Sequence, residues 1–162
     1  AFGQSLWMDF LRRSMLKTGE LERLIAGDGV SGITSNTSIF DKAIAGSHDY
    51  DESIQLLALA GRTEAEIYQT LTTDDIRVAA DCFRGVYEKT AGGDGFVSLE
   101  VSPHLAHDTE GTVADARRLW AEVDRPNLMI KVPATREGLP AIRRLIGEGI
   151  NVNITLLFGL PR

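Results

Sequence analysis

Chemically capable side chains lie at or near the ends of several strand-like segments of this sequence. They are Asp9, Thr34, Asn36, Glu100, Lys131, Asn153 and Thr155. The most unusual is Lys131, which lies inside the apolar stretch LMIKVPAT, where burial of a charged ammonium is costly. A lysine attacks a carbonyl only as the free amine, and desolvation favours that form. Carboxylates in different surroundings, such as Glu100 and Asp9, are suited to separate proton transfers. The set therefore indicates a shared functional site at the ends of the strands.

Five segments are predicted to be strands, and helical patterns separate them. The strands are expected at residues 5–9, 32–36, 95–101, 127–132 and 150–158. Helix starts are indicated by Thr18, by Ser38 with Asp41, and by Thr63 with Glu66, where both pairs fit the capping-box pattern. The long connection after the second strand is expected to hold extra helices at about 38–90. Alternation of strand and helix predicts parallel βαβ units.

Polar and apolar residues alternate within the strands. In INVNIT, Asn151, Asn153 and Thr155 alternate with aliphatic residues, and FVSLEVS shows the same pattern around Ser98 and Glu100. The central strands of an open, doubly wound sheet are nearly continuous apolar runs, because helices cover both faces. One apolar and one polar face instead fit an α/β fold of the parallel (β/α)8 TIM barrel type, whose active-site residues gather inside at the carboxyl ends of the strands.

The length fits only part of such a barrel. A closed barrel typically needs roughly 250 residues, and this chain provides about five β/α units. Residues 1–162 are therefore predicted to be the N-terminal portion of a single barrel domain. The chain starts at Ala1 without an initiator methionine and ends at LLFGLPR directly after a strand-like segment, so we expect a larger protein.

Composition disfavours several classes of partner. The net charge of -6 is spread without long runs of one sign, so neither a nucleic acid nor a membrane surface is expected as the principal partner. The single cysteine, Cys82, cannot form an intramolecular disulfide, which fits a reducing cytoplasm. No stretch approaches the roughly 18 apolar residues of a membrane span, and no signal-peptide pattern opens the chain. These features predict a soluble, cytoplasmic protein.

Each candidate residue also has a plainer interpretation. Lys131 could extend along the strand end to reach solvent, Asp9 could cap a helix, and Glu100 could be a cap or a surface carboxylate. Asn153 and Thr155 could simply fill the interior of the barrel. Residues of this kind on five consecutive strands favour a shared site over separate roles.

Two further motifs are discounted. GDGVSG, residues 27–32, matches the G-x-G-x-x-G pattern of dinucleotide-binding proteins, but it follows a helix and leads into a strand, the reverse of the order that binds pyrophosphate. His104, His107 and Asp108 could suggest a metal site, yet they lie in a loop with no second cluster of ligands. An ordinary loop is the better interpretation of both.

The sequence resembles the transaldolase family of class I, Schiff-base-forming enzymes. The resemblance covers nearly the whole chain and is closest to the long branch that includes fusions with phosphoglucose isomerase. Five motifs carry it: GQSLWMDFLRRSM, DGVSGITSNTSIFDKAI, SLEVSP, IKVPAT and NVNITLLF. Their order and spacing together make the match specific.

The resemblance implies a role for each catalytic candidate. Lys131 would form a Schiff base with the carbonyl of a ketose phosphate, and Asp9 would take the proton from the hydroxyl at the bond to be cleaved. Glu100 and Thr155 would hold and activate the water used in forming and dehydrating the carbinolamine. The implied enzyme transfers a dihydroxyacetone unit reversibly from fructose 6-phosphate or sedoheptulose 7-phosphate to an aldose phosphate, in the pentose phosphate pathway.

The resemblance also implies the substrate-binding residues. Asn36 and Asn153 would bind hydroxyls of the retained dihydroxyacetone unit, with Thr34 a weaker candidate for the same pocket. Sugar phosphates are the expected partners, and neither a metal nor a cofactor is expected.

The sequence departs from the family at two points. Thr37 follows Asn36 where members usually carry proline, so Asn36 is expected to be less firmly placed. The family's serine on the sixth strand and its phosphate-binding arginines have no counterpart here, and Arg162 lies too close to the fifth strand to be one of them. Two alternatives remain open: a fructose-6-phosphate aldolase-like or other class I aldolase, and an inactive, truncated barrel that self-associates through open strand edges.

Overall fold

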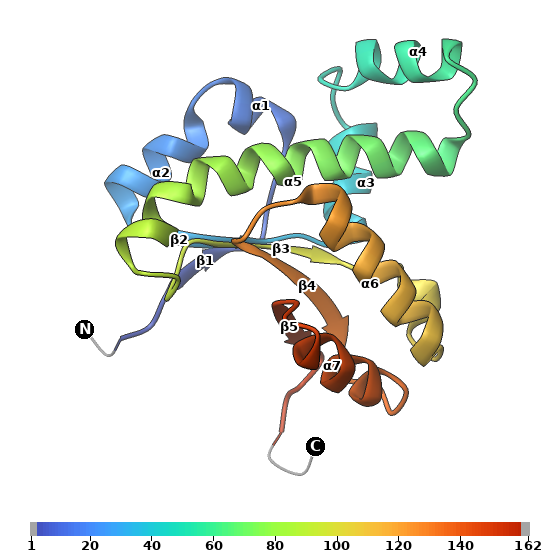
Figure 1. Cartoon of the computed structure of the whole chain (residues 1–162). Coiled ribbons are helices and arrows are strands. Elements are labelled where there is room, and N and C mark those ends of the chain that lie inside the picture. The colour runs from blue at the N-terminus through green and yellow to red at the C-terminus, as the bar shows by residue number, and fades with distance from the viewer. Residues whose placement is uncertain (1–2, 160–162) are drawn as a thin grey trace.

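Five parallel strands form one curved sheet in the computed structural model, which describes residues 3–159 (Figure 1). Each strand pairs with its neighbour in the chain, in the order β1 (Leu6–Met8), β2 (Val30–Thr34), β3 (Phe96–Glu100), β4 (Leu128–Pro133) and β5 (Val152–Thr155). The prediction of a parallel barrel architecture is confirmed: the strands form an incomplete (β/α) barrel.

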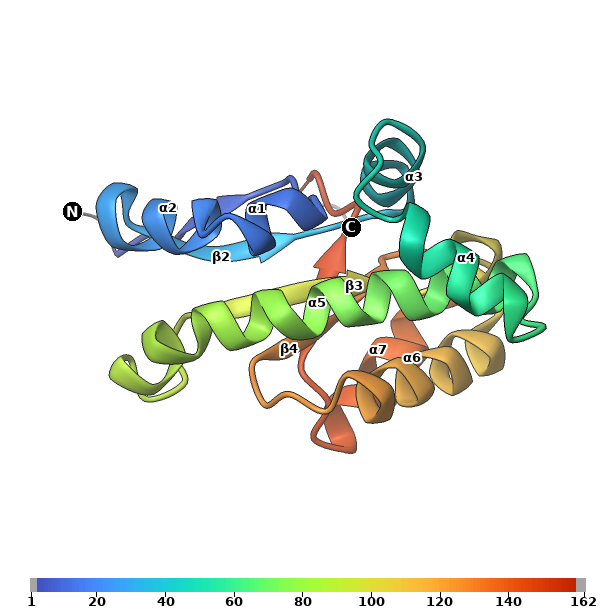
Figure 2. The same cartoon turned by 90° about the horizontal axis from the view of Figure 1, so that it is seen from above.

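Helices connect successive strands and cover one face of the sheet (Figure 2). α1 (Arg13–Lys17) and α2 (Glu20–Asp28) follow β1. α3 (Thr37–Ala45), α4 (Asp51–Leu59) and α5 (Glu64–Lys89) follow β2, and α5 lies along β3. The short 3-10 helix η1 (Pro103–Leu105) and α6 (Thr109–Val123) follow β3, and α7 (Gly138–Gly147) follows β4.

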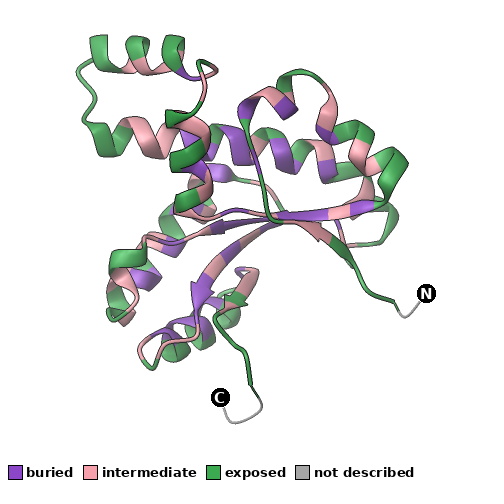
Figure 3. Ribbon diagram, turned by 180° about the vertical axis from the view of Figure 1, so that it is seen from behind, coloured by how far each residue is buried: buried purple, intermediate pink, exposed green. Residues whose placement is uncertain are grey.

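The hydrophobic core lies between the sheet and these helices (Figure 3). Alternate strand residues point into it because side chains of a strand alternate between its two faces. On the strands they include Ile33, Val97, Leu99, Leu128, Ile130 and Val132, and on the helices Leu21, Ile76, Phe83, Val113, Ala116 and Leu145. The remaining strand positions face the opposite, polar side, which is the interior of the barrel.

The boundaries of β2 correct two sequence predictions. Gly29 ends α2 in the left-handed conformation, with φ of 71°, so β2 begins at Val30, earlier than expected. β2 ends at Thr34 because the side chain of Asn36 caps α3 by accepting a hydrogen bond from the backbone N–H of Ile39 at 3.0 Å. The predicted capping pair of Ser38 with Asp41 is therefore wrong.

Among the other predicted helix starts and strand ends, some are confirmed and some are wrong. The capping box of Thr63 with Glu66 is confirmed, whereas α2 starts after Gly19, and Thr18 ends α1 instead of starting α2. The fifth strand was expected to run to residue 158 but ends at Thr155, because Leu156 takes a left-handed conformation with φ of 63°. GDGVSG is confirmed as a helix-to-strand turn. Arg162 lies outside the described residues.

A buried polar network joins α1, α4 and α5. Arg13 Nε donates to Asp75 Oδ1 at 2.7 Å, and the Tyr50 hydroxyl donates to Asp75 Oδ2 at 2.7 Å. The Arg13 guanidinium also donates to Ser53 Oγ and lies over the Tyr50 ring. Burial raises the pKa of Asp75, while Tyr50 and Arg13 oppose that shift. The network ties α1 and α4 to α5, which packs against β2 and β3.

Within residues 3–159, no helix combines the length and apolar character that a membrane crossing requires.

Candidate active site

Three candidate residues lie side by side across the inner face of the sheet. Glu100 on β3 is the register partner of Lys131 on β4, and Lys131 is the register partner of Asn153 on β5. Paired residues of neighbouring strands point to the same face, so a carboxylate and an amide flank the lysine. All three side chains are partly exposed, which leaves them open to a ligand.

Two hydrogen bonds cross over an intervening strand on this face. Lys131 Nζ donates to the backbone carbonyl of Ser35, just beyond β2, at 3.4 Å, although β3 lies between them. Asn153 Nδ2 on β5 donates to Ser98 Oγ on β3 at 3.0 Å, across β4. Strands are about 4.8 Å apart, so such contacts require side chains to converge over the strand between them. The sheet is therefore concave on the face that carries Lys131.

Glu100 is an unusual carboxylate. It is half-buried, and within the described part of the chain its side chain makes no hydrogen bond. Burial raises the pKa of Glu100, the positive charge of Lys131 opposes the shift, and the negative charge of Asp9 adds to it. A carboxyl group in this environment can hold a proton more readily than one on the surface, which suits general acid–base chemistry.

Asp9 and Thr155 lie at the ends of the two outermost strands. Asp9 follows β1 by one residue and is exposed. It does not cap α1, whose N-cap is Arg12, so the capping interpretation of Asp9 is excluded. Thr155 is the last residue of β5 and lies two residues beyond Asn153, on the same inner face. Asp9 influences Glu100 through its charge, and Thr155 extends the polar row beyond Asn153.

Asn36 and Thr34 lie at the end of β2. Asn36 Oδ1 caps α3, and the amide nitrogen, which has no hydrogen-bond partner among residues 3–159, is the donor that this side chain offers to a ligand. Thr34 Oγ1 is buried and likewise has no partner in the described region. A hydroxyl buried in this way lacks the hydrogen bond that most buried polar groups make.

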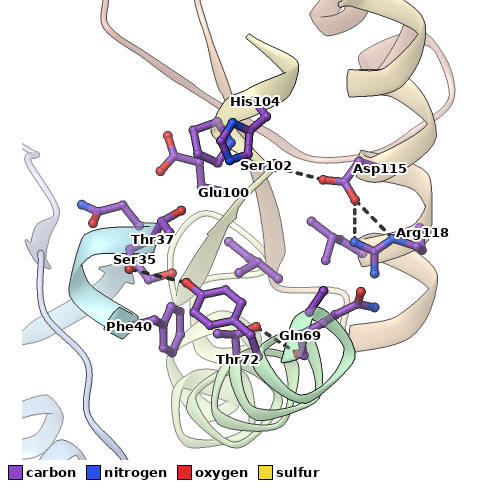
Figure 4. A pocket seen from close by; sticks show the side chains of 16 residues that line it. Ser35, Thr37, Phe40, Gln69, Thr72, Glu100, Ser102, His104, Asp115 and Arg118 are labelled. Carbon is purple, nitrogen blue, oxygen red and sulfur yellow. Dashed lines mark hydrogen bonds and ion pairs between the residues drawn. The ribbon is translucent and has the colours of Figure 1, made fainter. Parts of the chain in front are cut away.

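A cavity of about 420 Å³ adjoins this face at β3 (Figure 4). Its walls come from the ends of β2 and β3 and from α3, α5, η1 and α6. Glu100 and Asn36 border it, whereas Asp9, Lys131, Asn153 and Thr155 do not line it. Arg118 on its wall is already paired with Asp115 and Glu122, so it is not a free cation for a phosphate. The cavity thus shares Glu100 with the row of Glu100, Lys131 and Asn153, but neither Lys131 nor Asn153 lines it.

The loop histidines do not form a metal site. Asp108 caps α6 by accepting a hydrogen bond from the Gly111 N–H at 2.9 Å, and His107 pairs with Glu137. His104 lines the cavity near Glu100 (Figure 4). Within residues 3–159, no three side chains of the metal-binding types come together.

Two buried serines were not among the candidates from the sequence. Ser35 and Ser98 are fully buried, and their hydrogen bonds connect β2, β3 and β5 beneath Lys131 and Asn153. The polar alternation in FVSLEVS placed Ser98 on the inner face, but its contact with a residue 55 positions away was not visible. No pattern in the sequence pointed to Ser35, because its hydrogen bonds join it to residues 63 and 96 positions away.

Comparison with known proteins gives one consistent match. The family model described as Transaldolase/Fructose-6-phosphate aldolase matches residues 6–162. The chain is 54% identical to a protein named transaldolase from Saccharopolyspora erythraea over 99% of its own length and 43% of that protein. It is 52% identical to a transaldolase of Trichodesmium erythraeum, over 98% of its length and 42% of that protein. The chain therefore spans less than half the length of these relatives.

Proposed function

This chain belongs to the transaldolase/fructose-6-phosphate aldolase family, and we propose that it carries the imine-forming residues of a transaldolase. The reaction is the reversible transfer of a dihydroxyacetone unit from a ketose phosphate, such as fructose 6-phosphate or sedoheptulose 7-phosphate, to an aldose phosphate. The observation that carries the proposal is the row of Glu100, Lys131 and Asn153 on the concave face of the sheet. It combines a nucleophile, a proton-transferring group and a hydrogen-bond donor.

Lys131 forms the covalent intermediate in this proposal. The ammonium first gives up one proton, and the nitrogen lone pair of the free amine then bonds to the ketose carbonyl carbon. A second proton leaves the nitrogen, and the carbonyl oxygen departs as water after it has taken up two protons, which balance the two that the ammonium has lost. The nitrogen keeps one hydrogen and a positive charge as a protonated imine. That cation accepts the electron pair of the adjacent carbon–carbon bond when the bond breaks, so the reaction proceeds through a stabilised enamine.

Two carboxylates divide the proton transfers. Glu100, whose pKa is raised by burial, protonates the departing oxygen during dehydration, and Thr155 helps to hold the water. Asp9 removes the proton from the hydroxyl at the bond to be cleaved, as that carbon becomes an aldehyde. The different surroundings of Glu100 and Asp9, one half-buried and one exposed, support this division.

Asparagine and threonine side chains bind the retained three-carbon unit. The amide nitrogen of Asn36 is available because the helix uses only its oxygen, and Asn153 reaches the same face from β5. The unpartnered Oγ1 of Thr34 is a third site for a sugar hydroxyl. The proposed setting is the pentose phosphate pathway in the cytoplasm, where the thiol of Cys82 remains reduced.

A fructose-6-phosphate aldolase is a second candidate, because the matching family description names both activities. The two differ in the fate of the enamine: a transaldolase passes it to an aldose, whereas an aldolase protonates it and releases dihydroxyacetone.

Acceptor dependence separates these candidates. The protein is incubated with fructose 6-phosphate, with and without erythrose 4-phosphate, and the products are followed by mass spectrometry. Formation of sedoheptulose 7-phosphate only with the acceptor supports transaldolase. Release of dihydroxyacetone and glyceraldehyde 3-phosphate at the same rate without the acceptor supports the aldolase, and no turnover of either kind contradicts the proposal for this chain.

A further inference from the structure

We infer that Ser35 is a positioning residue for the imine at Lys131, and that its backbone carbonyl accepts the hydrogen bond of the protonated imine. The inference rests on the proposed function, because it concerns an intermediate of that reaction. It adds a backbone group from just beyond β2 to a site otherwise described through the side chains of the strands.

Ser35 is held to β3 by two hydrogen bonds to one atom. Its backbone N–H donates to the Ser98 carbonyl at 3.2 Å, and its hydroxyl donates to the same oxygen at 2.9 Å. The first bond continues the ladder between β2 and β3, while the second depends on the serine side chain. Both residues are fully buried, so solvent does not compete for these bonds. The hydroxyl therefore restrains Ser35 itself, whose carbonyl belongs to the peptide bond with Asn36.

The carbonyl of Ser35 faces the reacting nitrogen. Its oxygen lies 3.4 Å from Lys131 Nζ and is the only hydrogen-bond acceptor that Nζ contacts within residues 3–159. Glu100 on β3 is the charged register partner of Lys131, and the charges of both Lys131 and Asp9 act on Glu100. Neither carboxylate makes an ion pair with Lys131 in the described region, so the neutral carbonyl is its direct partner.

A fixed carbonyl dipole is well suited to this intermediate. The ammonium has three hydrogens, but the protonated imine keeps only one, so the direction of its single N–H determines how the imine plane is turned. A carbonyl oxygen already in place favours the positive charge on nitrogen and costs no reorganisation as that charge forms. Because the protonated imine is the electron acceptor of the cleavage step, its orientation affects the rate more than the binding of the sugar.

Removal of the Ser35 hydroxyl tests this role. Ser35→Ala keeps the backbone bond to Ser98 but loses the side-chain bond, and Ser47→Ala is the matched control, because the Ser47 hydroxyl donates to Ala43 at the end of α3. The rate of adduct formation on Lys131 is measured with fructose 6-phosphate and sodium borohydride over a range of sugar concentrations. For Ser35→Ala we expect a five- to tenfold lower rate at saturating sugar, as for the loss of about one hydrogen bond. The half-saturating concentration should stay within twofold.

Two results for Ser35→Ala would overturn the positioning role of Ser35. A saturating rate for Ser35→Ala equal to that of wild type and of Ser47→Ala would overturn the role of Ser35. A fall that only matches a loss of folded protein, measured by circular dichroism, would overturn it as well. If Ser35→Ala does not fold, Ser35→Cys keeps the side-chain size with a weaker donor, and the same rate decrease is expected. Wild-type protein that gives no adduct on Lys131 contradicts the proposed function itself, which separates that failure from the others.

Discussion

The side-chain amide of Asn153 donates a hydrogen bond to Ser98 Oγ at 3.0 Å, although β4 lies between their strands. The side chain of Asn153 therefore extends across β4, the strand that carries Lys131. Ser98, which is fully buried, fixes the direction of the Asn153 side chain. A buried serine thus orients the side chain that is proposed to bind the sugar.

Ser98→Ala should therefore weaken sugar binding. Without the Ser98 hydroxyl, Asn153 loses the acceptor that orients it, and we expect the half-saturating concentration of fructose 6-phosphate in borohydride trapping to rise about fivefold. The rate at saturation should change less, the reverse of the expected Ser35→Ala effect. Ser31→Ala, which removes an exposed hydroxyl bonded to the Leu6 carbonyl, is the control. An unchanged half-saturating concentration would show that Ser98 does not position Asn153.

Glu100→Gln should lower the rate of adduct formation and raise the free energy of unfolding at neutral pH. Since burial raises the pKa of Glu100, the folded protein binds this proton more tightly than the unfolded chain does. The contribution of Glu100 to the free energy of unfolding is therefore fully present below the ordinary glutamate pKa of about 4.3. It is lost as the pH rises through the raised pKa that Glu100 has in the folded protein. We expect the variant to match wild type at acidic pH and to exceed it at neutral pH in urea titrations. Adduct formation should fall by roughly 10²-fold or more. Equal stability at both pH values would contradict this description of Glu100.

Neighbouring arginines should differ greatly in their importance for folding. The side chains of Arg13 and Asp75 are 10% and 4% exposed, whereas those of Arg12 and Glu20 are 48% and 37% exposed. Arg13→Ala leaves a buried carboxylate unpaired and should lower the free energy of unfolding by about 3–5 kcal/mol. Arg12→Ala should cost about 1 kcal/mol or less. Urea denaturation measures both, and similar losses for the two variants would refute the assignment of Arg13 to a stabilising network.

Gly32 allows β1 and β2 to approach each other at Trp7. A Cβ atom at Gly32 would lie 2.4 Å from the indole ring, so Gly32→Ala must displace Trp7. We expect a loss of roughly 1–3 kcal/mol and a change in tryptophan fluorescence. Gly85→Ala is the control: it lies within α5 with open space around it and should stabilise the protein by about 0.5–1 kcal/mol. Unchanged fluorescence in Gly32→Ala would rule out this packing.

We propose that open strand edges make this chain associate with copies of itself. Among the described residues, β1 pairs only with β2 and β5 only with β4. Phe158, beyond β5, is 88% exposed. Unpaired edges and exposed apolar groups favour association. Light scattering should show a mass that rises with concentration and that falls in Phe158→Asp. Leu59→Asp, on α4, should not change it, and a monomer at every concentration would exclude self-association.

Local patterns predicted much of the sheet, because alternation within a strand is a local property. It placed Glu100 and Asn153 on the same face as Lys131 and favoured the barrel over a doubly wound sheet. The cap formed by Asn36 was missed, because Ser38 with Asp41 matched a capping pattern as well. The pairing of Arg13 with Asp75 and the hydrogen bonds of Ser35 join residues 62 and 63 positions apart, and nothing in the neighbouring sequence indicates such contacts. Polar contacts between residues far apart in the sequence could therefore be identified only from the three-dimensional structure.

The most direct test of the central claim is peptide mass mapping after borohydride reduction in the presence of fructose 6-phosphate. Hydride addition to the imine carbon converts the intermediate into a stable secondary amine, which marks the lysine that reacted. The proposed chemistry predicts a sugar-derived adduct on the peptide that contains Lys131 and none on peptides with Lys17, Lys42 or Lys89. A chain that binds the sugar but gains no adduct on Lys131, or gains it equally on all lysines, would contradict the proposed role of Lys131.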